Sequence, residues 1–257
     1  LKDQIVLPSF FDMHFHWVQD DVSAMPKDSL LSWLTNYTWP YEAKFKSKEY
    51  TLKKVLAFTE KLLSVGTLGG ACFASIHPHT VEYALDSFIG DFIVGNVLMT
   101  ENSPDYLVQS ESDALGIVKC LSEKYTDRYA LTPRFALTAT PNLMKESSKI
   151  AKNNNSFIQT HLSETTFEIS KTLEHIKSYP GYQDVKSYTE IYERCAHLGA
   201  KTILGHGVHL SDEEWNILKS TDTVIAHCPS SNAPISDLGL GSGLFDFSKA
   251  EEFGVRW

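Results

Sequence analysis

Short apolar runs alternate along the whole chain with longer stretches whose apolar residues have helical spacing, and this alternation constrains the fold more than any other feature. The runs are candidate strands at residues 5–11, 68–74, 92–98, 129–131, 157–160, 202–204, 223–226 and from 255 onward. Predicted helices lie between them at residues 30–37, 50–64, 80–89, 112–124, 142–152, 165–177, 189–197 and 212–220. Such a repeat builds a parallel sheet.

Eight strand–helix units favour a (β/α)8 barrel over an open, doubly wound sheet. No Gly-x-Gly-x-x-Gly sequence follows an early strand, which argues against a dinucleotide-binding sheet. A length of 257 residues suits one barrel domain. Ser211, followed by Glu214, fits a capping box and marks one helix start. We therefore predict an α/β fold in which residues 1–257 form a single domain.

Charge and cysteine content limit the partners and the compartment. The formal net charge of -9 and the lack of a Lys/Arg run disfavour a nucleic-acid partner. The four cysteines lie far apart and form no Cys-x-x-Cys pair, so we expect free thiols in a reducing compartment. With no apolar run of membrane-spanning length and no signal peptide, we expect no membrane association and a cytoplasmic protein.

Histidines follow the apolar runs at four points. They occur in Phe11-Asp-Met-His14-Phe-His16, in Phe157-Ile-Gln-Thr-His161, in Ile203-Leu-Gly-His206-Gly and in Val224-Ile-Ala-His227-Cys. In a parallel barrel the active site lies at the carboxyl ends of the strands, so these junctions are where chemistry is expected.

His14 and His16 lie two residues apart on one predicted strand, so both imidazoles point to the same face and can bind a single zinc or iron ion. His77 and His79 form a second pair with the same spacing. A proline separates them and a predicted helix follows, so we expect this pair to be outside the site.

Glu164 comes three residues after His161, which places a carboxylate near whatever His161 binds. A metal-activated water needs such a base, although a carboxylate at a helix start can also serve only the helix dipole. His206, between two glycines, is either a core histidine or a group facing the metal. For His227, a role in the core or in supporting other site residues is indicated at least as well as a contact with substrate.

Taken together and in this order, the motifs resemble the amidohydrolase superfamily. They are Pro8-x-Phe10-x-Asp12-x-His14-x-His16, His161, His206 and the segment His227-Cys-Pro-Ser-x-Asn232. Finer features are similar to the guanine deaminase family within it: Gln19, the block from Leu31 to Pro40-x-Glu42, Thr132-Pro-Arg-Phe135 and His161-Leu-Ser-Glu164. The similarity extends through nearly the whole chain.

The resemblance implies a metal-dependent TIM barrel that converts guanine to xanthine and ammonia by attack of a metal-activated hydroxide. It assigns His14, His16 and His161 to a zinc ion, with iron(II) as the alternative. It also assigns Glu164 to proton transfer and His206 to the nucleophile or the metal. Gln19, Arg134 and Phe135 would hold the purine. The resemblance also implies a homodimer.

The resemblance also implies two features that this sequence does not include: an aspartate at the end of an eighth strand, and a small β domain built from both termini. We therefore expect a barrel that is incomplete at strand eight. The alternatives are an amidohydrolase acting on another amino-heterocycle, such as a pterin, a triazine or an adenosine derivative, and a catalytically inactive metal-binding fragment.

Overall fold

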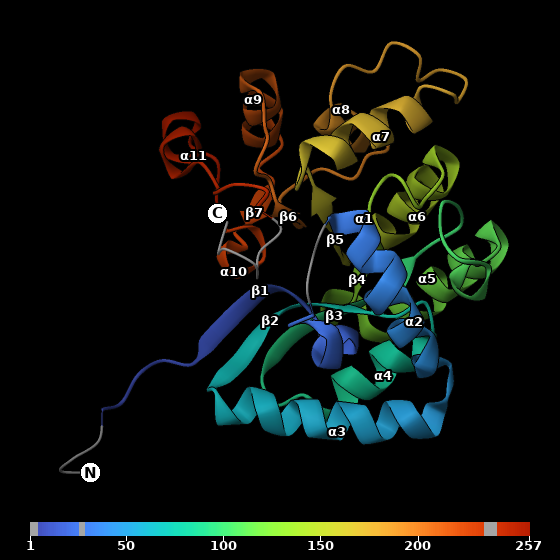
Figure 1. The fold of residues 1–257 in the computed structure, drawn as a ribbon, viewed down its shortest axis with the longest axis vertical. Helices are drawn as coiled ribbons and strands as arrows, with labels where there is room; N and C mark the ends of the chain where they lie inside the picture. Colours follow the sequence, from blue (N-terminus) through green and yellow to red (C-terminus); the bar gives the residue numbers. More distant parts are fainter. Residues whose placement is uncertain (1–4, 26–28, 234–240) are drawn as a thin grey trace.

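Seven parallel strands form one sheet in a computed structural model, which describes residues 5–25, 29–233 and 241–257. Their order in the sheet follows their order in the chain (Figure 1). The strands are β1 (Phe10–His16), β2 (Thr67–Ala74), β3 (Asp91–Leu98), β4 (Ala130–Pro133), β5 (Phe157–Leu162), β6 (Thr202–His206) and β7 (Val224–Ala226). This arrangement confirms the predicted α/β barrel type of fold.

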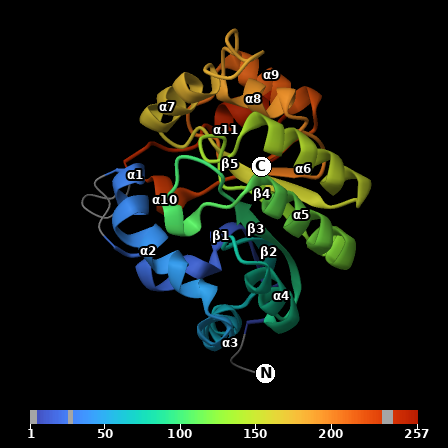
Figure 2. The same ribbon diagram turned by 90° about the vertical axis from the view of Figure 1, so that its right-hand side faces the viewer.

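Helices surround the strands (Figure 2). They are α3 (Lys48–Ser64), α4 (Pro78–Ser87), α5 (Glu111–Tyr125), α6 (Pro141–Asn153), α7 (Thr166–Ile176), α8 (Tyr188–Arg194), α9 (Asp212–Ser220) and α11 (Phe247–Phe253). Side-chain caps fix most of their starts, since a hydroxyl accepts from an otherwise unpaired backbone N–H. Those N-caps are Ser47, Ser110, Thr140, Thr165, Ser187 and Ser211, and the capping box predicted at Ser211 is confirmed.

The first strand begins five residues later than its apolar run suggested. Residues 5–9 have no regular structure, and pairing with β2 runs from Phe10 opposite Thr67 to His16 opposite Phe73. The prediction of a strand over 5–11 was therefore wrong in its bounds, because ladder pairing with a neighbour, and not hydrophobicity, sets where a strand lies. The shift places His14 and His16 inside β1.

The eighth position of the sheet is marked by a single parallel bridge between Val224 and Arg256. The amide of Ile225 donates to the carbonyl of Arg256 at 3.0 Å. The strand expected from residue 255 onward is thus represented among the described residues by this bridge alone.

A long connection between β1 and β2 folds over one end of the sheet. It carries η1 (Trp17–Val22), α1 (Leu30–Trp33), η2 (Leu34–Thr38), which is one turn of π-helix, α2 (Trp39–Glu42) and η3 (Ala43–Lys46). Helical spacing of apolar residues predicts one helix over residues 30–37; the structure divides that region into α1 and η2. α1 and the short α10 (Pro229–Asn232) lie on the same side of the sheet (Figure 2). This side carries the candidate site.

Within the described ranges, no helix has the length and apolar character needed to cross a membrane.

Candidate active site

A cavity of about 580 Å³ opens at the carboxyl ends of the strands. The ends of β1, β5, β6 and β7 contribute histidines to its lining, and the connection after β1 contributes an apolar wall that includes Leu30, Trp33 and Leu34. All eight residues assigned to the site from the sequence line it: His14, His16, Gln19, Arg134, Phe135, His161, Glu164 and His206. A flat ring of one or two fused cycles fits a space of this size.

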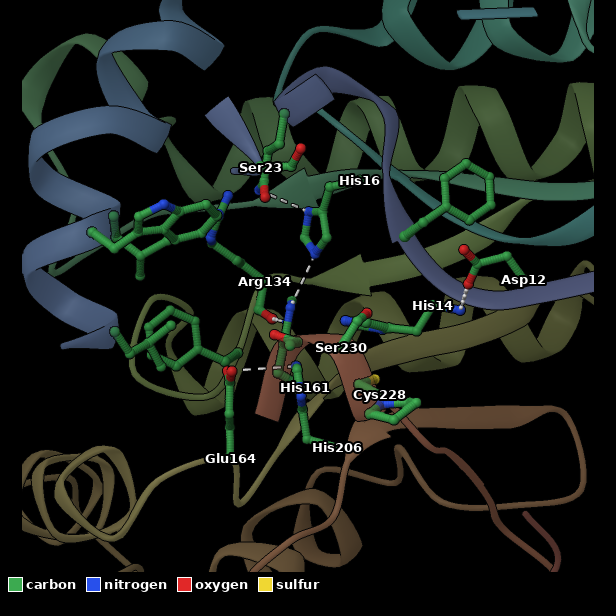
Figure 3. Close-up of a pocket in the computed structure, with 18 of the residues that line it drawn as sticks. Asp12, His14, His16, Ser23, Arg134, His161, Glu164, His206, Cys228 and Ser230 are labelled. Carbon is green, nitrogen blue, oxygen red and sulfur yellow. Dashed lines mark hydrogen bonds and ion pairs between the residues drawn. The ribbon is translucent and has the colours of Figure 1, made fainter. Parts of the chain in front are cut away.

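Three imidazoles converge at the centre of this cavity (Figure 3). One nitrogen each from His14, His16 and His161 lies within 4.8 Å of the other two. The Nε2 atoms of His16 and His161 are 3.1 Å apart. Two histidines of one strand and a third from across the barrel make a set of nitrogen donors of the kind that binds zinc or another divalent ion.

The surroundings of these rings prepare them to bind a cation. Nδ1 of His161 donates to the backbone carbonyl of Arg134 at 2.5 Å, which leaves the Nε2 lone pair directed at His16. Burial, reinforced by neighbouring histidines, holds the pKa of His14, His16 and His161 well below the ordinary value. Neutral imidazoles with free lone pairs are the form that a metal requires.

Glu164 and His206 face each other beside the three imidazoles. Oε2 of Glu164 lies 3.4 Å from Nε2 of His206, and both side chains are buried (Figure 3). Asn232 joins them from behind: its Oδ1 lies 3.0 Å from Nδ1 of His206, and its Nδ2 donates to Glu164 at 3.3 Å. Burial acts against charge on His206, but Glu164, Cys228 and Asn232 favour it and raise the pKa to about 10.

The helix that follows Glu164 holds its backbone in place. Oε2 of Glu168 accepts from the amides of Glu164 and Thr165 at 2.9 and 3.2 Å, and the Thr165 hydroxyl completes a capping box. Glu164 itself precedes the N-cap and takes no part in the box. Its side chain is therefore free to face the cavity, so the structure does not support the alternative role as a carboxylate serving only the helix dipole.

Gln19 and Arg134 come together at one wall of the cavity through a buried carboxylate. Nη1 of Arg134 lies 3.0 Å from each oxygen of Glu42, and Nε2 of Gln19 donates to Oε1 of Glu42 at 2.8 Å. The same Nε2 lies 3.0 Å from Nδ1 of His16. Phe135 follows Arg134 and presents its ring 6.5 Å from that of His161, measured between centroids. This wall combines polar groups with an apolar face.

The other candidate histidines lie elsewhere. His79 is buried at the start of α4, with Nε2 2.8 Å from the carbonyl of Phe45, and its ring stacks on His77 at 5.6 Å. Neither residue lines the cavity. His227 reaches the cavity rim, but its ring packs at 4.8 Å against Phe247 and does not join the metal-donor group.

Four residues of the site were not identified from the sequence as functional candidates. Glu42 and Asn232 lay in segments quoted only for their resemblance, and Glu168 had a detectable signal, since Thr165 and Glu168 have capping-box spacing. Cys228 lines the cavity, and its sulfur lies within 4.8 Å of nitrogens of His14 and His206. No spacing rule connects residues 42, 134 and 232, so their proximity had to come from the fold.

Comparison with known proteins agrees with this geometry. Residues 5–256 match the model of the Amidohydrolase family. The chain is 33% identical to the guanine deaminase of Escherichia coli (strain K12) over 99% of its own length and 57% of that protein's. It is 34% identical to the guanine deaminase of Rattus norvegicus over 95% of its own length and 54% of that protein's. The chain thus spans little more than half the length of these curated relatives.

Solved structures give the same result. A guanine deaminase from C. acetobutylicum with guanine bound in its active site superposes with a TM-score of 0.86 at 31% identity, covering 97% of this chain and 59% of the other. A triazine hydrolase variant superposes with a TM-score of 0.79 at 18% identity over 97% of this chain and 58% of the other, a level that establishes a shared fold alone.

Proposed function

The chain belongs to the amidohydrolase family, and from this premise we propose that it deaminates guanine hydrolytically to xanthine and ammonia. One observation carries the proposal: the imidazoles of His14, His16 and His161 converge in the same cavity as the Glu164–His206 pair and the Gln19–Arg134 wall. The relatives named above as guanine deaminases support guanine as the substrate, as does the bound guanine in one of their structures.

We propose that His14, His16 and His161 hold zinc, with iron(II) as the alternative. The donor set fits, because three neutral nitrogens converge and the hydrogen bond from His161 to the Arg134 carbonyl orients its free lone pair inward. When bound, a divalent cation lowers the pKa of water enough to supply an oxygen nucleophile at neutral pH. The remaining steps belong to side chains of this protein.

Glu164 performs the proton transfers in this proposal. Its carboxylate takes both protons of the attacking water in turn. It delivers the first to the ring nitrogen beside the attacked carbon as the oxygen adds, and the second to the exocyclic nitrogen, which leaves as ammonia while the carbon–oxygen bond becomes a carbonyl. His206, 3.4 Å from Glu164 and held by Asn232, orients the water and stabilises negative charge on its oxygen. Guanine and water are thereby converted to xanthine and ammonia without any further reactant.

Gln19, Arg134 and Phe135 hold the base. A planar heterocycle with a carbonyl and ring N–H groups needs donors, an acceptor and an apolar face, and these three side chains provide them at one wall. The wall lies next to His161, since the Phe135 ring is 6.5 Å from the His161 ring and the Arg134 carbonyl accepts from Nδ1 of His161. In this proposal a base held at the wall lies beside the converging imidazoles.

Deamination of a triazine, a pterin or an adenosine derivative is less well supported. Similarity to triazine hydrolases is limited to the fold at 18% identity. An inactive metal-binding fragment is the other alternative, and it differs from the proposed enzyme in holding the metal without turnover.

The test is incubation of the zinc-loaded full-length protein with guanine while xanthine is followed by chromatography and ammonia by a coupled assay. We expect both products in equal amounts, and less conversion of adenosine, a pterin and a triazine. Stoichiometric zinc without either product would identify a metal-binding protein instead.

We further propose that residues 1–257 contribute one catalytic barrel domain, that the protein forms a homodimer, and that it resides in the cytoplasm. The single continuous sheet supports the first proposal. The four cysteines, all free thiols, support the last. The homodimer rests on the family resemblance, and light scattering of the purified protein tests it.

A further inference from the structure

We propose that Glu42 is a positioning residue that sets the direction of the hydrogen bonds Gln19 and Arg134 offer to the substrate. In this way it selects a neutral base with a lactam edge, a ring N–H beside a C=O. The inference rests on the proposed function, because it takes Gln19 and Arg134 as the residues that hold the base.

The geometry joins three segments that are far apart in sequence. Glu42 ends α2, Gln19 lies in η1 and Arg134 follows β4. The Glu42 side chain is fully buried and receives Nη1 of Arg134 at 3.0 Å on both oxygens and Nε2 of Gln19 at 2.8 Å on one. Gln19 and Arg134 both line the cavity. Glu42 therefore acts on a bound ligand through these two side chains.

The carboxylate determines which end of the Gln19 amide is available. An ionised carboxylate only accepts hydrogen bonds, so Gln19 must turn its NH2 group toward Glu42, and its carbonyl oxygen is then the group left for a ligand. Arg134 has only donors. Together the two side chains offer one acceptor next to donors, which complements a ring N–H beside a carbonyl.

Glu42 also neutralises the charge of Arg134. An arginine exposed to a cavity without a counter-ion attracts anions such as carboxylates, whereas the ion pair with Glu42 leaves a wall with no net charge. The pair therefore favours a neutral heterocycle over an anionic one. A substitution at Glu42 should alter this preference without removing any group that touches the reacting atoms.

The test compares Glu42→Gln with a matched control, Glu214→Gln, in the full-length protein. Glu214 is also a buried carboxylate that accepts hydrogen bonds from a neighbouring helix, in this case from the amide and hydroxyl of Thr189, but it does not line the cavity. For each variant, kcat and KM are measured with guanine and with 2-aminopurine, which has the same amine and ring but lacks the lactam.

For Glu42→Gln we expect the KM for guanine to rise about ten- to a hundredfold, the range for losing one or two charge-assisted hydrogen bonds. The kcat should fall less than tenfold. The preference for guanine over 2-aminopurine should drop at least tenfold, and purine-6-carboxylate, an anion, should become a stronger competitive inhibitor. Glu214→Gln should leave all four quantities within twofold of the wild type.

A folded Glu42→Gln protein with an unchanged KM and an unchanged preference would overturn the inference. If that variant does not fold, Glu42→Asp replaces it. Aspartate keeps the charge but draws the oxygens back by one methylene, so the KM for guanine should rise at least fivefold, and an unchanged KM would again overturn the inference.

Failure of the proposed function gives a different result. If the wild-type protein binds guanine but does not deaminate it, the proposed function fails, and the inference is judged from guanine affinity measured by calorimetry. At least tenfold weaker binding by Glu42→Gln supports it, and equal binding overturns it. If wild-type protein does not bind guanine at all, both are wrong.

Discussion

Gly205 lies directly against the imidazole of His14. A Cβ built on Gly205 would fall 2.4 Å from Cε1 and 2.6 Å from Nδ1 of that ring, much closer than atoms in contact approach. The two residues come from β6 and β1, and the bare backbone of Gly205 makes room for the ring to reach His16 and His161. Of the two glycines beside His206, Gly205 therefore has a specific steric role.

Gly205→Ala should therefore displace the His14 ring from the donor group. We expect the zinc affinity to fall at least tenfold and the free energy of unfolding to fall by about 1–3 kcal/mol, as is usual for overpacking. Zinc titration and thermal unfolding measure the two effects. Gly116→Ala is the control: Gly116 lies within α5, a Cβ there meets nothing within 4 Å, and alanine should stabilise the helix slightly.

Glu164→Gln should abolish most of the activity while leaving the site assembled. An amide cannot take a proton from water, so we expect kcat to fall about 10²- to 10⁴-fold. Zinc content and guanine affinity should stay near wild type. The control is Glu174→Gln, an exposed carboxylate on α7 paired with Lys171. Activity within tenfold of the wild type in the Glu164 variant would assign the proton transfer to another group.

His16→Ala should lose the metal, whereas His79→Ala should keep it. Substituting a residue that only orients a metal ligand weakens metal binding by up to about 100-fold. Removing His16, a direct ligand, should therefore weaken zinc binding by more than that. His79 does not line the cavity. Its loss removes one hydrogen bond to the Phe45 carbonyl, which still accepts from the Thr51 hydroxyl at 3.0 Å, so we expect about 0.5–1.5 kcal/mol of lost stability. Equilibrium dialysis and urea unfolding of both variants separate the two effects, and equal zinc affinities would contradict the three-histidine site.

His197 should make the protein less stable as the pH falls. It is fully buried, and burial lowers its pKa to about 4 from an ordinary 6.5. The unfolded chain therefore binds a proton that the folded protein resists. The neutral His197 contributes to the free energy of unfolding in full above pH 6.5. That contribution, about 3 kcal/mol in total, is lost as the pH falls toward 4.

Urea unfolding of the wild type and His197→Gln at several pH values between 7.5 and 4.5 measures this effect. The stability difference between the two proteins should shift in favour of the variant as the pH falls. A difference that is independent of pH would show that His197 does not titrate in this range.

The sequence by itself was enough to predict the class of fold and the positions of the metal-binding candidates. Strand and helix periods repeat along the chain, and histidines follow apolar runs, which are local properties that a linear pattern records. The two-residue spacing of His14 and His16 places them on one face of a strand without any knowledge of its neighbours. Glu164 was identified in the same way, from its distance to His161.

Only the tertiary structure decided how distant residues combine. Glu42 joins Gln19 to Arg134, Asn232 joins His206 to Glu164, and Gly205 makes room for His14. The bounds of β1 were also set by pairing with β2 and not by its own hydrophobicity. A hydrogen bond or a steric contact between residues 92 positions apart depends on strand register and on the path of the connecting loops, and neither leaves a periodic trace in the sequence.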